Sequence, residues 1–139
     1  MNMPPARLSL EKISRSFEGQ EVVSDLSLDI AAGEIVCLLG PSGCGKSTTL
    51  RIAAGVERQD SGRALLNGRV VSDDARHEPP EARSVGLMFQ DFALFPHLNI
   101  CDNVAFGLKG AKAERQKAAL THLERVGLPG FGDKYPHIL

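Results

Sequence analysis

Four residues at fixed spacing carry the clearest chemistry in this chain of 139 residues. The pattern G-x-x-x-x-G-K-S, a phosphate-binding P-loop, is completed by Gly40, Gly45, Lys46 and Ser47. Glycines let the backbone curl so that successive N–H groups point at an anion, and a following helix directs its positive dipole end the same way. The lysine adds charge for the β and γ phosphates, and the serine hydroxyl is a ligand for a bridging magnesium ion.

A P-loop requires a strand before it and a helix after it. Residues 35–39 form a β-branched, apolar run that predicts the strand, and the residues after the loop follow a helical pattern that places Leu50, Ala53 and Ala54 on one face. The alternative is a glycine-rich turn that only links two elements. The flanking pattern favours the phosphate-binding interpretation.

The rest of the chain alternates between strand-like and helix-like patterns. The expected elements are strands over 7–13 and 22–30 with a turn over 14–20, a hairpin over 63–71 turning at Asn67-Gly68, a polar surface loop over 72–83, a strand over 84–89, and helices over 100–108 and 113–126 with Leu120, Leu123 and Val126 toward the core. Before the first of these two helices, a loop over 91–98 is rich in large apolar side chains, namely Phe92, Leu94, Phe95 and Leu98. A loop of this composition is expected to pack on another surface.

Composition narrows the class of protein. A hydrophobic content of 42% and a charged content of 24% are typical of a soluble globular protein, and the net charge of −1 leaves no electrostatic footprint for nucleic acid. The sequence has no apolar run long enough to span a bilayer, and its first residues do not resemble a signal peptide. These features predict a cytoplasmic location.

The cysteines and histidines do not indicate a metal site. Cys37, Cys44 and Cys101 lack metal-ligand spacing; Cys37 is expected in the buried strand, and Cys44, inside the loop, is expected to make the site sensitive to thiol reagents. The histidines also lack ligand spacing, and they are His77, His97, His122 and His137.

The motifs together resemble a known family. Residues 40–48, with 53–55, 60–62 and 85–90 around them, resemble the ATP-binding subunit of an ABC transporter over nearly the whole chain. The resemblance implies an α/β fold, a P-loop NTPase core with an N-terminal antiparallel β-subdomain. It divides the chain into a β-subdomain over 1–33 and 63–71, a P-loop core over 34–62 and 84–90, and the start of a helical subdomain over 91–139.

The resemblance also assigns roles residue by residue. Gln90 matches the Q-loop glutamine, which reaches the magnesium ion and the attacking water and acts with Lys46 in catalysis. Phe17 matches an aromatic residue that stacks on adenine, with Val22 packing beside it. The remaining contacts to ATP and Mg²⁺ are assigned to Ser42, Gly43, Cys44, Gly45, Lys46, Ser47 and Thr48. The simpler alternatives are a core role for Phe17 and a polar strand cap for Gln90.

The segments 89–98 and 103–108 are similar to the importer branch that serves ferric iron, polyamines or sugars, and most of all to the ferric-iron type. This similarity implies an ATPase subunit on the cytoplasmic face of a membrane. The implied partners are a permease docked through residues 90–98, a second nucleotide-binding subunit and, indirectly, a solute-binding protein; nucleic acid is not expected.

One departure from the family pattern concerns the end of the chain. In the family, the motif at 135–139 runs into a Ser-Gly-Gly-Gln signature, which this chain lacks together with the second magnesium carboxylate, the catalytic glutamate and the switch histidine. We therefore expect an N-terminal portion that hydrolyses ATP negligibly by itself. The alternatives are a non-catalytic ATP-binding fragment and a soluble ABC ATPase without a transport role.

Overall fold

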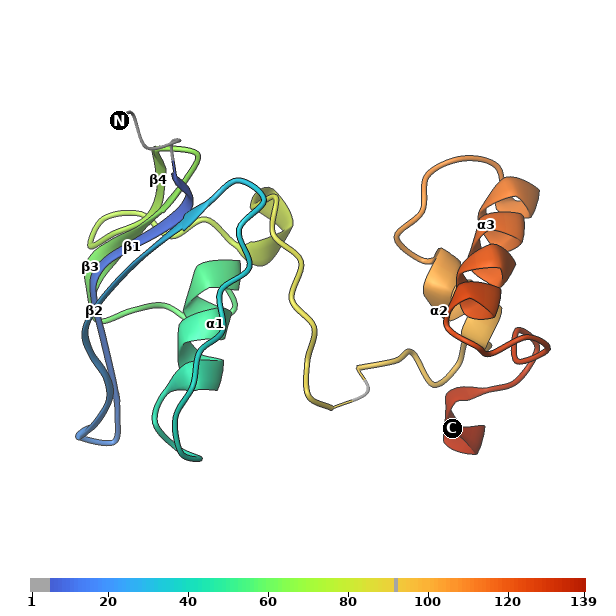
Figure 1. Cartoon of the computed structure of the whole chain (residues 1–139), viewed down its shortest axis with the longest axis horizontal. Coiled ribbons are helices and arrows are strands. Elements are labelled where there is room, and N and C mark those ends of the chain that lie inside the picture. Colours follow the sequence, from blue (N-terminus) through green and yellow to red (C-terminus); the bar gives the residue numbers. More distant parts are fainter. Residues whose placement is uncertain (1–5, 92) are drawn as a thin grey trace. The chain divides into compact units, whose positions relative to one another are not determined.

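The computed structural model of the chain describes residues 6–91 and 93–139. Phe92, part of the predicted apolar loop, lies outside these residues. The chain divides into two compact units, Met1–Met88 and Phe89–Leu139, and each is described by itself (Figure 1).

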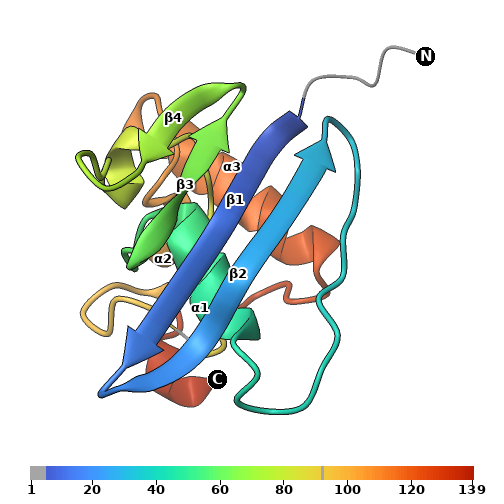
Figure 2. The same cartoon turned by 90° about the vertical axis from the view of Figure 1, so that its left-hand side faces the viewer.

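The first unit is built on a four-stranded antiparallel sheet. Its strand order is β2-β1-β3-β4, with β1 at Ala6–Phe17, β2 at Gln20–Ala31, β3 at Ser61–Leu66 and β4 at Arg69–Ser72. The long strands β1 and β2 pair along their length, and β1 also pairs with β3 (Figure 2). The predicted antiparallel β-subdomain is therefore confirmed.

Two-residue turns close both hairpins of this sheet. Asn67 and Gly68 join β3 to β4 with φ values of 50° and 76°, which confirms the predicted hairpin. Glu18 and Gly19 join β1 to β2 with φ values of 49° and 81°. Positive φ at both central residues is the geometry whose twist matches that of antiparallel strands.

The turn predicted over 14–20 is wrong in extent. Strand β1 continues to Phe17, and only Glu18-Gly19 turns. The serine-rich segment stays extended because distant groups satisfy its backbone; the Ser16 N–H donates to Asp60 Oδ2 at 2.7 Å. The contact with Asp60 therefore keeps this segment in a strand, although its polar composition is typical of turns.

The core of this unit lies between the sheet and helix α1 (Lys46–Ala54), which crosses one face of the sheet in Figure 2. Burying each large aliphatic side chain there stabilises the fold by about 1.5–3 kcal/mol. The buried face of α1 centres on Ile52 and Ala53, so Leu50, expected on the core face, is instead half-exposed. The core residues are Leu10, Ile13, Val23, Ile52, Ala53, Ala64 and Val71.

Two predicted strands are absent from the described residues. Residues 35–39 and 84–89 have extended or irregular backbone without ladder pairing, and Ile35 and Leu39 are each 91% exposed, as Met88 is at 94%. Cys37, expected to be buried, is exposed too. A strand exists only when a neighbouring strand supplies N–H and C=O partners, and within the described residues none pairs with either run.

The second unit packs two helices, α2 (Ile100–Ala105) and α3 (Lys112–Arg125), close to the predicted ranges. Asn99 caps α2 by accepting the Asp102 N–H at 2.7 Å. The core is a small cluster of Cys101, Ala105 and Ala119. On α3, Leu123 is buried as expected, but Leu120 is exposed, and so is Val126, which follows the last residue of the helix.

Two single turns of 3-10 helix complete the described elements, η1 (Pro80–Ala82) in the first unit and η2 (Pro136–Ile138) in the second. Within residues 6–91 and 93–139, no helix has the length and apolar character needed to cross a bilayer.

Candidate phosphate-binding site

The glycine loop closes tightly against strand β2. Gly45 is buried at φ 90°, and a Cβ atom at this position would lie only 2.4 Å from the Val22 carbonyl oxygen and 3.1 Å from Val23 Cγ2. Only glycine fits both the left-handed backbone and this close approach. The loop is therefore packed against β2 at the residue that immediately precedes the first turn of α1.

Helix α1 begins at Lys46 without a side-chain cap on its N-terminus. The first N–H groups of a helix have no partner within it, so those at the start of α1 remain available to an anion. The first turn is held instead by Thr49, whose N–H and Oγ1 both donate to the Gly45 carbonyl at 2.9 Å. Sequence analysis did not single out this buried threonine.

The Lys46 ammonium folds back over its own loop. Its Nζ donates to the carbonyl oxygens of Gly40 and Pro41, each at 2.7 Å, and lies 3.5 Å from Cys44 Sγ. The charge is thus placed at the loop that its motif predicts, and phosphate oxygens are stronger acceptors for it than neutral carbonyls. The other residues predicted to contact the nucleotide differ in exposure. Thr48 is half-buried, and the exposed residues are Ser42, Gly43, Cys44 and Ser47.

Phe17 and Val22 lie at the end of the sheet where the loop closes. Val22 is half-buried beside the core, and its carbonyl faces Gly45. Phe17 ends β1 and pairs with Gln20 across the hairpin, two residues from Val22. Phe17 as a residue is 39% exposed and does not belong to the core cluster, which favours a surface role over the core alternative.

The far end of α1 is held by an arginine that sequence analysis missed. Arg83 is only 5% exposed, and its Nη1 donates to the carbonyls of Ile52 at 2.9 Å and Ala53 at 3.2 Å. A cation at this position satisfies the last carbonyls of the helix and opposes the negative end of its dipole. Burial lowers the pKa of the Arg83 guanidinium, and nearby Glu78 partly offsets this effect.

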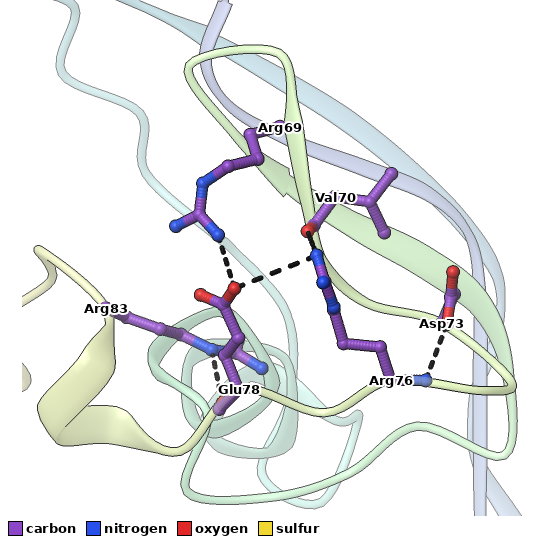
Figure 3. A network of polar contacts seen from close by, with 6 residues as sticks. All are labelled: Arg69, Val70, Asp73, Arg76, Glu78 and Arg83. Carbon is purple, nitrogen blue, oxygen red and sulfur yellow. Dashed lines mark hydrogen bonds and ion pairs between the residues drawn. The ribbon is translucent and has the colours of Figure 1, made fainter.

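Glu78 connects Arg83 to strand β4 of the sheet (Figure 3). Its backbone carbonyl accepts Arg83 Nε at 2.8 Å, while its carboxylate pairs with Arg69 of β4 and lies 4.0 Å from Arg76. The hydrogen bond from Arg69 is the main cause that lowers the pKa of Glu78. His77 adds a link, since its Nε2 lies 3.1 Å from the Gly55 carbonyl.

Gln90 is exposed at the start of the second unit. Its joint role with Ser47 on a metal ion stays a prediction. Within the described residues, no group of three or more His, Cys, Asp or Glu side chains is arranged to hold a metal ion.

The loop that follows Gln90 is organised by Asn103, which sequence analysis missed. Asn103 Oδ1 accepts the Phe95 N–H at 2.8 Å, and its Nδ2 donates to the Leu98 carbonyl at 3.0 Å. The Phe95 ring lies on Phe106 with a centroid distance of 4.5 Å. Residues 95–98 of this loop therefore pack on α2 and on Phe106, which agrees with the expectation that the apolar loop packs on a surface.

A glycine loop that closes on a strand and opens a helix, with a lysine over the loop, defines a P-loop phosphate-binding site. The sequence profile described as "ABC transporter" matches residues 23–137. The chain belongs to the ABC transporter family.

Relatives named for three different solutes are almost equally similar to the chain. It is 47% identical over 137 residues to the spermidine/putrescine import ATP-binding protein PotA of Nitrosospira multiformis, covering 96% of the chain and 37% of that protein. It is 48% identical to the Fe(3+) ions import ATP-binding protein FbpC of Streptomyces coelicolor, with 92% and 36% covered. It is 45% identical to the sulfate/thiosulfate import ATP-binding protein CysA of Thermosynechococcus vestitus, with 93% and 38% covered.

The chain therefore spans between 36% and 38% of the length of these three relatives. Among solved structures, it resembles the ATP-binding cassette MJ0796 in a dimeric post-hydrolysis state bound to ADP and Pi. The TM-score is 0.80 at 29% identity, with 95% of this chain and 62% of that chain covered. The predicted P-loop α/β fold is confirmed, while the expected preference for ferric iron stays a prediction.

Proposed function

We propose that the chain binds ATP with Mg²⁺ as part of the nucleotide-binding subunit of an ABC importer, which couples ATP hydrolysis to solute uptake. The proposal rests on the glycine loop that packs on β2. Lys46 Nζ donates to two carbonyls of this loop, and the N-terminus of α1 has no side-chain cap. Unpaired helix N–H groups and one mobile cation match the needs of a triphosphate. The relatives named as import ATP-binding proteins support the same assignment.

In this proposal, Lys46 exchanges the Gly40 and Pro41 carbonyls for the β and γ phosphate oxygens. The exchange is favourable because the ammonium then pairs with an opposite charge, whereas a carbonyl offers it only a dipole. Ser47 fits a magnesium ion because its exposed hydroxyl supplies the hard oxygen that this ion prefers. Bound Mg²⁺ supplies neutralisation of the phosphate charge. Gln90 is proposed as its second protein contact.

The apolar segment from Gln90 to Leu98 is the proposed permease contact. Phe95 and Phe106 remain partly exposed although they pack on each other, and together they present an apolar surface on the second unit. Exposed apolar patches of this kind mark protein–protein contacts. The proposal places the subunit at the cytoplasmic face of a membrane, with a second nucleotide-binding subunit and, indirectly, a solute-binding protein.

For hydrolysis, we propose that a polypeptide of these 139 residues alone turns ATP over negligibly. Phosphoryl transfer to water requires a group that orients or deprotonates the water. Asp73 follows the paired strand β4, but its Oδ1 already accepts the N–H groups of Ala75 and Arg76 at 2.9 and 2.7 Å. Asp91 beside Gln90 is exposed and a poor base. Steady magnesium-dependent phosphate release that Lys46→Ala abolishes would contradict this proposal.

Nucleotide binding is tested by titrating the chain with a fluorescent ATP analogue and Mg²⁺. Lys46→Ala is expected to weaken binding by roughly tenfold or more, because a charge-assisted contact is lost. Lys109→Ala, which removes an exposed lysine of the second unit, is the matched control and is expected to bind normally. Equal affinity of Lys46→Ala and the native chain would overturn the assignment.

A further inference from the structure

One face of the Phe17 ring is covered by an arginine of the same strand. The guanidinium carbon of Arg15 lies 4.5 Å from the ring centroid. Phe17 as a residue is nevertheless 39% exposed and lies outside the core cluster, so the face opposite Arg15 is the side left for a ligand. The ring is therefore a platform with one covered side and one open side.

Arg15 is itself held by two carboxylates that follow the P-loop helix. Its guanidinium pairs with Glu57 at 2.7 Å and with Asp60 at 2.5 Å, and the side chains of Arg15 and Glu57 are each 24% exposed. Asp60 also accepts the Ser16 N–H at 2.7 Å. The connector after α1 thus fastens both the end of β1 and the arginine that lies on Phe17.

This arrangement limits where the Phe17 ring can point. A guanidinium is planar and stacks on an aromatic face, and its two carboxylate partners fix its plane. Turning the ring away would break the cation–π contact while the arginine stays in place. A pre-oriented ring loses less conformational entropy when a second planar group stacks on it.

We propose that Arg15 is a positioning residue for adenine, because it holds the Phe17 ring so that its open face receives the base. The inference rests on the proposed function, since it names how the same site selects a nucleotide that carries a base. Arg15 affects binding of the base through Phe17 and does not itself contact the phosphates.

The test compares a ligand that has a base with one that has none. Affinities of the full chain for Mg-ATP and for Mg-tripolyphosphate are measured by calorimetry. Arg15→Gln is expected to weaken ATP roughly fivefold and to change tripolyphosphate by less than about twofold, because only the base contact is lost. In a Phe17→Ala background the same substitution is expected to have no further effect on ATP, since the two residues act as a unit.

Two further variants serve as controls. Arg63→Gln breaks an arginine–carboxylate pair with Glu11 on the same sheet and is expected to leave both affinities unchanged. Arg15→Lys keeps a positive charge between the carboxylates, so it is expected to stay folded and to lose part of the ATP affinity, because an ammonium does not stack as a plane.

The outcomes separate this inference from the proposed function. Parallel losses for ATP and tripolyphosphate, an unchanged ATP affinity, or an additive effect in the Phe17→Ala background would each overturn the positioning role. A native chain that binds tripolyphosphate and ATP equally well would overturn it too, while leaving the phosphate site intact. A native chain that binds neither ligand would overturn the proposed function itself.

Discussion

The side chain of Arg83 occupies the space that a side chain at Gly55 would need. A Cβ atom at position 55 would lie 2.6 Å from Arg83 Nε, and Gly55 adopts φ 83° as it ends α1. The glycine therefore serves two purposes, since it permits the left-handed helix end and leaves room for a buried cation. Through this pair the P-loop helix is held at the end opposite the phosphate site.

Removal of the Arg83 guanidinium is expected to destabilise the first unit. Arg83→Met keeps much of the volume but leaves the Ile52 and Ala53 carbonyls without their donor, at a cost of about 2–4 kcal/mol. Urea unfolding monitored by circular dichroism measures the change. Arg63→Met, at an exposed ion pair, is the control and is expected to cost less than about 1 kcal/mol. Equal midpoints for both variants would exclude the capping role.

A methyl group at Gly45 is expected to damage both the fold and nucleotide binding. Gly45→Ala places Cβ against the Val22 carbonyl and strains a backbone at φ 90°, so the loop must move. Gly43→Ala is a matched comparison, because Gly43 has φ 81° but open space around its Cβ position. We expect at least a tenfold greater loss of ATP-analogue affinity for Gly45→Ala than for Gly43→Ala. Similar losses of affinity for the two variants would show that strain of the left-handed backbone causes the effect and that the contact with Val22 does not.

Stability is expected to fall as the pH drops below about 4.5. The Ser16 N–H and then Arg15 lower the pKa of Asp60, and Arg69 lowers that of Glu78. A carboxylate with a lower pKa in the folded state contributes stability that is complete above its unfolded pKa, near 4, and is lost as the pH falls through the folded pKa.

Urea midpoints measured between about pH 7 and pH 2.5 test this dependence. The double variant Asp60→Asn, Glu78→Gln should be less stable at neutral pH and should lose less stability on acidification. An acid dependence as steep as that of the native chain would assign the effect to other carboxylates.

Docking of a permease on residues 90–98 is expected to bring Ala93 close to its cytoplasmic loops. Ala93 is exposed, so Ala93→Cys presents a thiol on this segment. Cross-linking in membranes that contain the full-length subunit and permease should yield a covalent product. Glu124→Cys, exposed on α3, is the comparison site. Product from Glu124→Cys alone would place the permease on another surface.

The local sequence pattern was sufficient to predict much of the structure of this chain. The P-loop, the start of α1 at Lys46 and the Asn67-Gly68 hairpin follow from the sequence because each depends on φ preferences or spacing over a few residues. The apolar runs over 35–39 and 84–89 predict strands for the same local reason. They remain unpaired because a strand also needs a partner, which no property of the run supplies.

The sequence by itself determined which residues are predicted to bind phosphate, and the tertiary structure decided what holds them in place. Arg83 reaches a carbonyl 31 positions earlier, and Arg15 meets Asp60 45 positions later. In the sequence, both arginines look like solvated surface charges. Their partners are set by how the sheet and the connector fold around α1, because a hydrogen bond or ion pair depends on distance in space and is independent of distance along the chain.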